Sequence, residues 1–350
     1  MLILEAQKDS LMKFRFVTVI LVLYLPFLFS CRRDHYRINT SSVSVNIEIK
    51  RLEQDLFSTA PEEIPGIVPR LKEKFGDCLR LFSFVINAGD ISDPSFGDIL
   101  TGFCTDKLNN EVYESVMKQY SDIKSIEDDL EDAFRHYLWY FPGEKIPAIF
   151  TCITRFNNSL IIGDSVLGIS LDRYLGRDCK YYPRLEIYKY MAAKMNSWNI
   201  VPDCIYGWGS TEWDFETLKY NSDNLLSEML HEGKLKYFEK CMLPEINDTT
   251  LFGFSAGQMK FCRNNESQMW QYLIENDLIF STDQVIIRKL TGEAPFTSYF
   301  TNESPGRAAI WIGFRIVESY MMKNRDVSLG DLMKNTDIQG LLGKAKYSPE

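Results

Sequence analysis

Histidine is scarce in this chain: the 350 residues contain three, His35, His136 and His231. Zinc sites and many acid–base centres rely on imidazole, so three copies allow very few such arrangements. The eight cysteines do not indicate a disulfide framework or a metal site either. None of them forms a C-x-x-C pair, and those after Cys31 are odd in number and irregularly spaced. We therefore expect neither a disulfide scaffold nor a zinc knuckle, and no cofactor.

Signatures of nucleotide and nucleic-acid binding are also absent. The chain has no G-x-G-x-x-G, no G-x-x-x-x-G-K-[ST] and no G-x-S-x-G, so a nucleotide site or a hydrolase nucleophile elbow has no basis in the sequence. No long basic run occurs, and 39 Lys and Arg residues against 48 Asp and Glu residues give a net charge of −9. Binding to phosphate backbones favours the opposite balance, so we exclude nucleic acid as a partner.

The composition is that of an ordinary folded protein. Hydrophobic residues make up 45% of the chain and charged residues 25%, within the globular range. Between residues 45 and 350 the sequence has no repeat, no low-complexity tract and no linker rich in proline or glycine. We therefore predict one globular domain over residues 45–350, large enough for a substantial core.

The amino-terminal residues predict a secretory signal. Residues 12–31 read MKFRFVTVILVLYLPFLFSC, with two basic residues before an apolar run. That run is shorter than the roughly 20 residues that a membrane-spanning helix needs, and it contains Pro26, so we favour a signal peptide over a transmembrane helix. Because acidic residues precede it, Met12 is the favoured true start, and we assign residues 1–30 to the signal peptide.

The signal ends in Leu28-Phe29-Ser30-Cys31, which resembles a bacterial lipobox, in which the cysteine becomes the acylated first residue of the mature protein. The alternative is an ordinary cysteine beside a cleaved signal. Residues 31–44 are polar and non-periodic and predict a tether. The tether begins with basic residues and lacks an acidic run. We therefore expect Cys31 to anchor the protein to the cell membrane or outer membrane, on the periplasmic side.

Hydrophobic periodicity predicts a mainly helical α+β fold with a small β-sheet. Alternation at the start of residues 45–56 predicts a short strand, and residues 146–154 and 159–170 predict further strands, with a hairpin turn at Gly163-Asp164. Helical spacing predicts helices over residues 61–88, 110–120, 126–140, 184–199, 222–240, 255–276, 281–290 and 306–323.

Residues 224–238, NLLSEMLHEGKLKYF, contain the one stretch similar to a catalytic signature. A metalloprotease helix carries H-E-x-x-H because histidines four residues apart lie on one face and can both bind zinc. Neither frame around His231 supplies the second histidine, so we predict no metal site here. We expect Glu228, His231 and Glu232 to be surface or partly buried polar residues, and the alternative is that they line a cleft.

Residues 302–307, NESPGR, form a second polar cluster. Ser304 suits a helix N-cap and Pro305 suits the first helical turn, which predicts that a helix begins there. The functional alternative is a pocket for an anion at the helix N-terminus. Its candidate residues are Asn302, Glu303 and Arg307.

Arg307 needs an acidic partner, because a helix N-terminus already carries partial positive charge. That partner is either internal, from Glu303 or a carboxylate of residues 224–238, or it is the carboxylate of a bound peptide held by the guanidinium fork. We favour the internal pair, because the loop precedes an apolar helix that we expect to be buried.

Several segments, in fixed order, resemble the gliding-motility-associated lipoproteins of Bacteroidetes, the GldB type. They are Cys31, VLGISLDRYLGRDCKYYP (166–183), NIVPDC (199–204), residues 224–238, LIENDLIFSTD (273–283), APF (294–296) and NESPGRAAIWIGFRIVESYM (302–321). The resemblance implies a lipid-anchored periplasmic protein connected with gliding or with the cell envelope. It implies no particular biochemical activity.

A more distant likeness is to zinc-peptidase-like (zincin-like) proteins, which carry H-E-x-x-H on one helix and E-G-x-x-x-[YF] on a later one. Glu232-Gly233 and Tyr237 match the later motif. The first motif would fall within residues 202–212, where no histidine occurs. This likeness therefore implies a degenerate zincin-like fold without its metal.

Taken together, the sequence predicts a non-catalytic binding or assembly component of the envelope, with an envelope protein or a peptide as partner. One alternative is an active hydrolase that uses Glu228, His231 and Glu232. Another is a structural subunit of a secretion or motility complex. The candidate cleft or binding residues are Glu228, His231, Glu232, Glu266, Asn302, Glu303 and Arg307.

Overall fold

The structure, a computed structural model, describes residues 35–349. The chain divides into two units, Met1–Ile38 and Asn39–Glu350, and the helices and strands of the described residues all belong to the second. The predicted signal peptide, Met12 and Cys31 lie outside the described residues. Within residues 35–349, no helix combines the length and the apolar character needed to cross a membrane.

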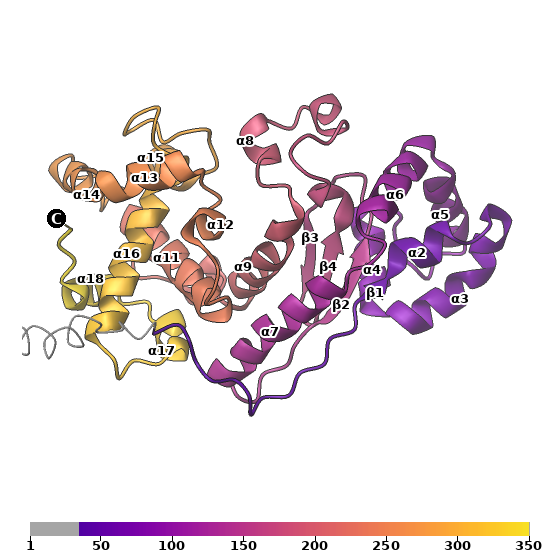
Figure 1. Cartoon of the computed structure of the whole chain (residues 1–350), viewed down its shortest axis with the longest axis horizontal. Coiled ribbons are helices and arrows are strands. Elements are labelled where there is room, and N and C mark those ends of the chain that lie inside the picture. Colours follow the sequence, from indigo (N-terminus) through magenta and orange to yellow (C-terminus); the bar gives the residue numbers. More distant parts are fainter. Residues whose placement is uncertain (1–34, 350) are drawn as a thin grey trace, which may run out of the picture. The chain divides into compact units, whose positions relative to one another are not determined.

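Four short strands form one mixed sheet (Figure 1). They are β1 (Lys50–Arg51), β2 (Ala148–Cys152), β3 (Leu160–Gly163) and β4 (Val166–Ser170), in the order β1-β2-β4-β3. Strand β2 runs parallel to both β1 and β4, whereas β3 is antiparallel to β4. Every residue of β4 is buried, as expected for an inner strand covered on both faces. The predicted α+β class, mainly helical with a small sheet, is confirmed.

The predicted strands are found, with two changes of boundary. Residues 159–170 form the β3–β4 hairpin, whose turn is at Asp164 and Ser165, one residue later than predicted. The strand predicted at the start of residues 45–56 is reduced to β1, because helix α2 (Leu52–Phe57) begins directly after it. Leu52 and Leu56 lie one helical turn apart and are both fully buried, so helical spacing decides the conformation there.

The helices between β1 and β2 follow the predicted pattern only in part. They are α2, α3 (Ile64–Phe75), α4 (Asp77–Val85), α5 (Phe96–Thr105), α6 (Lys107–Gln119) and α7 (Lys124–Tyr140), with a 3₁₀ turn η1 (Pro61–Glu63). The helix predicted over residues 61–88 breaks at Gly76, whose φ of 51° ends α3. The sequence pattern does not predict α5.

Helices cover both faces of the sheet, as the alternation along β3 shows. Ile161 belongs to a core cluster with Leu79 and Phe82 of α4. The next residue, Ile162, faces helix α9 (Ile200–Glu212), and a Cβ at Gly207 would lie 2.6 Å from its Cδ1. Helix α9, which the sequence pattern does not predict, therefore packs directly on β3 through a glycine (Figure 1).

The segment between β4 and α9 is mostly irregular. The helix predicted over residues 184–199 is wrong, because this segment contains only short turns and one short helix. These are η2 (Leu171–Tyr174), η3 (Tyr182–Leu185), α8 (Lys189–Ala192) and η4 (Ser197–Asn199). None of residues 183–190 is buried, so no helical spacing of buried side chains occurs there, and Glu186 takes a left-handed conformation with φ of 55°.

The remaining helices form the carboxy-terminal half of the protein. They are α10 (Phe215–Leu218), α11 (Leu225–Met242), α12 (Asp248–Phe252), α13 (Ala256–Asn264), α14 (Glu266–Glu275), α15 (Gln284–Thr291), α16 (Ala308–Lys323), α17 (Leu329–Lys334) and α18 (Ile338–Ala345). The helix predicted over residues 255–276 is split at Asn265 into α13 and α14, and α10, α12, α17 and α18 are additional to the prediction.

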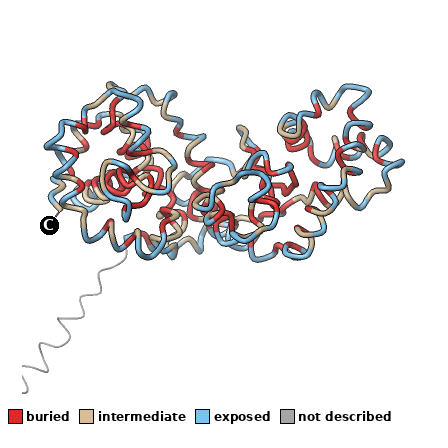
Figure 2. Tube along the Cα trace, turned by 90° about the horizontal axis from the view of Figure 1, so that it is seen from above, coloured by how far each residue is buried: buried red, intermediate tan, exposed pale blue. Residues whose placement is uncertain are grey.

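Helix α11 is the centre of this half. Of its 18 residues, 15 are buried, so neither of its faces is open to solvent. Figure 2 shows that buried residues gather in the interior of the folded body. It crosses α16 where two glycines meet: a Cβ at Gly233 would lie 2.4 Å from the Gly313 carbonyl carbon, and one at Gly313 would lie 1.9 Å from the Met229 oxygen. Any side chain at these positions would force the helices apart, so this crossing holds both helices in register.

Candidate functional site

The loop before α16 has a different geometry from the one predicted. Helix α16 begins at Ala308, and Arg307 precedes it in a left-handed conformation with φ of 63°. The hydroxyl of Ser304 donates to the carbonyl of Thr301 at 2.6 Å, so the prediction that Ser304 caps the helix is wrong. Thr297 takes that role, because its Oγ1 accepts the backbone N–H of Ala308 at 3.1 Å. Ser304 instead closes its own loop.

Arg307 is held by two carboxylates of the protein itself. Its Nη2 donates to Oε2 of Glu232 on α11 at 3.0 Å, and its Nη1 donates to Oε1 of Glu293 at 3.1 Å. The Arg307 side chain is only 18% exposed. Glu303, the other predicted internal partner, is exposed on the loop. The acidic partners of Arg307 are therefore internal, and both ends of the guanidinium fork are occupied.

This ion pair extends into a longer network. The Tyr206 hydroxyl on α9 lies 3.0 and 2.9 Å from the two carboxylate oxygens of Glu232. Lys194 donates to Glu293 at 2.9 and 2.8 Å. Although burial opposes ionisation, Lys194 and Arg307 together hold the pKa of Glu293 below its usual value. We call Lys194, Glu293, Arg307, Glu232 and Tyr206 the Arg307 network.

Two further polar pairs lie beside the Arg307 network. Lys236 donates to Oε2 of Glu239 at 2.8 Å, and both residues belong to the buried helix α11. Burial raises the pKa of Glu239, and Lys236 offsets part of that effect. Asp203 on α9 accepts the hydroxyl of Tyr174 at 2.9 Å, and burial raises its pKa to about 6.

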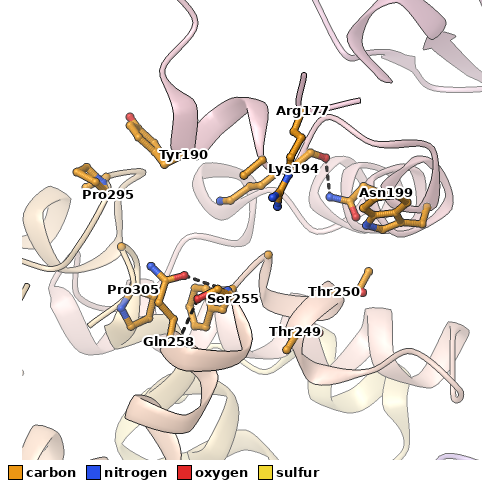
Figure 3. A pocket seen from close by; sticks show the side chains of 16 residues that line it. Arg177, Tyr190, Lys194, Asn199, Thr249, Thr250, Ser255, Gln258, Pro295 and Pro305 are labelled. Carbon is orange, nitrogen blue, oxygen red and sulfur yellow. Dashed lines mark hydrogen bonds between the residues drawn. The ribbon is translucent and has the colours of Figure 1, made fainter. Parts of the chain in front are cut away.

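These groups surround a cavity of about 280 Å³, which we call the inner cavity. Its polar wall includes Arg173, Tyr174, Lys194, Asp203, Tyr206, Lys236, Glu239, Glu293 and Arg307. An outer cavity of about 240 Å³ adjoins it, since Lys194, Asn199, Thr250 and Gly253 line both. Figure 3 shows the outer cavity, with Arg177, Lys194 and Asn199 on one side and Thr249, Ser255 and Gln258 on the other.

Glu228 and His231 lie outside both cavities. The carboxylate of Glu228 forms no hydrogen bond or ion pair with any residue in the described part of the chain, and burial raises its pKa to about 7. The Nδ1 of His231 is 3.1 Å from the Tyr220 hydroxyl, and burial lowers the pKa of this histidine to about 4, so the imidazole is neutral at pH 7. Glu228 and His231 therefore have different contacts from Glu232, although all three residues lie on α11.

The other predicted site residues are elsewhere. Glu266 accepts from Arg315 at 3.1 Å and from the Tyr347 hydroxyl at 2.7 Å. Asn302 and Glu303 are exposed. Of the seven predicted cleft residues, the structure joins only Glu232 and Arg307. Between residues 35 and 349, no group of three or more His, Cys, Asp or Glu side chains is arranged to hold a metal ion.

Most residues of the inner cavity were not recognisable as site residues from the sequence. Lys236 and Glu239 give the clearest signal, because they are spaced by three within a helix whose other residues are largely apolar. Asp203 and Tyr206 lie on α9, where glycine residues interrupt the apolar spacing that would indicate a helix. Glu293 and Lys194 come from irregular segments, where no periodicity marks them.

The fold and the site define a class: an α+β protein with a cavity that is lined by paired charges, between residues 159–206 and the carboxy-terminal helices. The model of the gliding motility protein GldB family matches residues 33–349. The chain therefore belongs to this family of gliding-motility lipoproteins. Neither the curated proteins nor the solved structures contain a match to it.

Arg307→Ala should lower the free energy of unfolding by about 3 kcal/mol, because it leaves the Glu232 carboxylate without its cation. The left-handed backbone conformation costs arginine and alanine a similar free energy, so the change in stability reports the loss of the Arg307 side-chain contacts. Chemical denaturation measures the change. The control Arg80→Ala breaks the exposed Arg80–Asp77 pair and should cost less than about 1 kcal/mol. Equally small effects of both variants would contradict the importance of the internal pair.

Glu228→Gln should stabilise the protein at pH 8 and have little effect at pH 4.5. Burial raises the pKa of Glu228 to about 7 in the folded state. The stability of the fold therefore falls as the pH rises from the pKa of the unfolded chain through about 7, because the buried carboxyl must then ionise. Allowing for partial exposure, we expect a gain of about 2 kcal/mol at pH 8. Urea denaturation at both pH values measures it, with the exposed Glu73→Gln as control. A loss of stability at pH 8 would refute this account.

Proposed function

We propose that this protein is a lipid-anchored, periplasmic component of the cell envelope whose folded body binds a ligand or partner without catalysis. The observation that carries this proposal is the state of Glu232. Its carboxylate accepts from both Arg307 and Tyr206, so it is an internal structural anion rather than a base open to substrate. The inner cavity beside it supplies a preformed site of the size used for small ligands.

A hydrolase remains the second candidate, because one observation favours it. A carboxyl with a pKa near 7 suits general acid–base catalysis at neutral pH, and burial gives Glu228 such a pKa. Against this, Glu228, His231 and Glu232 contact different groups and do not converge on one cavity. Descent from a zincin-like peptidase that lost its histidines would be compatible with a binding role.

Metal content and peptide hydrolysis separate the two candidates. A zinc site needs three or four protein ligands. We therefore predict less than one equivalent of zinc in the purified full chain, and no cleavage of casein after zinc is added. His231→Ala and Glu228→Gln should leave both readings unchanged. Tight one-to-one zinc binding that is lost in His231→Ala, or casein cleavage that is lost in Glu228→Gln, would establish the hydrolase instead.

Cys31→Ala should move the protein from the membrane fraction to a soluble or uncleaved form. Burial of acyl chains contributes about 0.8 kcal/mol per CH₂ group, so two or more chains hold a protein firmly on a membrane. Cell fractionation and intact-mass measurement of the wild type and the variant test this. Cys78→Ala, which changes a buried cysteine of the folded body, is the matched control and should stay in the membrane. A wild-type mass without a lipid adduct would refute the anchor.

A further inference from the structure

Most charges on the wall of the inner cavity are already neutralised by one another. The exceptions are one cation and one carboxylate, Arg173 and Asp203, which line the cavity without an ion-pair partner among the described residues. The neutralised groups form four ion pairs: Lys194 with Glu293, Lys236 with Glu239, and Arg307 with both Glu232 and Glu293.

Arg173 is fixed in place by neutral groups. Its Nη1 donates to the carbonyl of Phe156 at 3.2 Å, and its Nε donates to the hydroxyl of Ser159 at 3.3 Å. The turn that carries Phe156 is itself held by Asp172, whose Oδ2 accepts the backbone N–H groups of Thr154 at 3.2 Å and Phe156 at 2.7 Å. The guanidinium is therefore positioned at the cavity wall without an ion pair among the described residues, although its charge also favours the ionised form of the neighbouring Asp172.

Asp203 presents the opposite charge at the same cavity. It accepts the Tyr174 hydroxyl at 2.9 Å, and Lys236 and Lys194 favour its ionised form through space, but neither lysine forms an ion pair with it among the described residues. Tyr174 directly follows Arg173 in η2. The same short segment therefore carries Arg173 and the hydroxyl group that contacts Asp203. A carboxylate away from water is costly when no cation contacts it directly, and a ligand that brings a cation into contact with it reduces that cost.

We propose that the inner cavity binds a small zwitterion, with its ammonium group at Asp203 and its carboxylate at Arg173. Free amino acids and short peptides share this chemistry. The inference rests on the proposed binding role and names the ligand class for it. A volume of about 280 Å³ is near the lower end for ligand sites, which suits a molecule of this size. The adjoining outer cavity offers space for a longer peptide.

Calorimetric titration of the detergent-purified full chain at pH 7 tests the ligand class. The probes are alanine, alanyl-alanine and trialanine, each compared with its N-acetyl form and its amide form, which lack the ammonium and the carboxylate respectively. We expect at least one zwitterionic probe to bind, and each of its blocked forms to bind at least tenfold more weakly. Tightest binding by alanine identifies a free amino acid as the ligand, and tightest binding by a longer probe identifies a peptide.

Two variants test the assigned contacts. Asp203→Asn removes the charge but keeps an oxygen that accepts the Tyr174 hydroxyl, and Arg173→Gln removes the guanidinium. Each should weaken the best zwitterionic probe at least tenfold. Asp77→Asn and Arg80→Gln, which change an exposed pair on α4, are the matched controls and should bind like the wild type.

The outcomes separate this inference from the proposed function. Failure of every zwitterionic probe to bind, or equal binding of the blocked forms, overturns the ligand class whether or not the variants fold, and leaves the non-catalytic role intact. Unchanged binding in both folded variants overturns the assigned contacts. If alanyl-alanine binds and mass spectrometry of the same samples finds it cleaved, the ligand class is supported and the non-catalytic role is refuted.

Discussion

The pairing of buried charges on helix α11 is the constraint on which the carboxy-terminal half depends. This helix is enclosed on all sides yet carries Lys234, Lys236 and Glu239 among its buried residues. Removing an ion from water costs several kcal/mol unless a partner compensates. Lys236 and Glu239 compensate each other, and Lys234 donates to the carbonyl of Asn335 at 2.9 Å, just beyond α17. The segment after α17 must therefore bring a carbonyl group to Lys234, which limits how this segment can be arranged on α11.

Arg307 connects this constraint to the cavity. It lies at the start of α16, the helix that crosses α11 through glycine, and it pairs with Glu232 on α11 and Glu293 on the loop after α15. The same ion pairs that stabilise the packing therefore form part of the wall of the inner cavity. A cavity built in this way is preorganised, because its charged side chains are held before any ligand arrives.

Membership of the GldB family and the architecture of the site address different questions. The family match over residues 33–349 connects the protein with gliding motility but names no chemistry. The site indicates a kind of chemistry but no biological process: paired charges form part of the cavity wall, and Arg173 and Asp203 add one charge of each sign. Anchoring by a lipid at Cys31 would place such a binding body at a membrane surface.

The sequence by itself determined the α+β class, the β3–β4 hairpin and a helix over residues 222–240, which the structure has at 225–242, because these follow from local periodicity. For Arg307 it favoured an internal carboxylate, from Glu303 or residues 224–238, over the carboxylate of a bound peptide. Only the tertiary structure decided that the partners are Glu232 and Glu293, that Glu266 pairs elsewhere, and that α9 is a helix. The reason is physical: a buried ion pair joins residues from distant segments, and helix α9 is stabilised by close packing of its glycine on β3, neither of which leaves a periodic pattern along the chain.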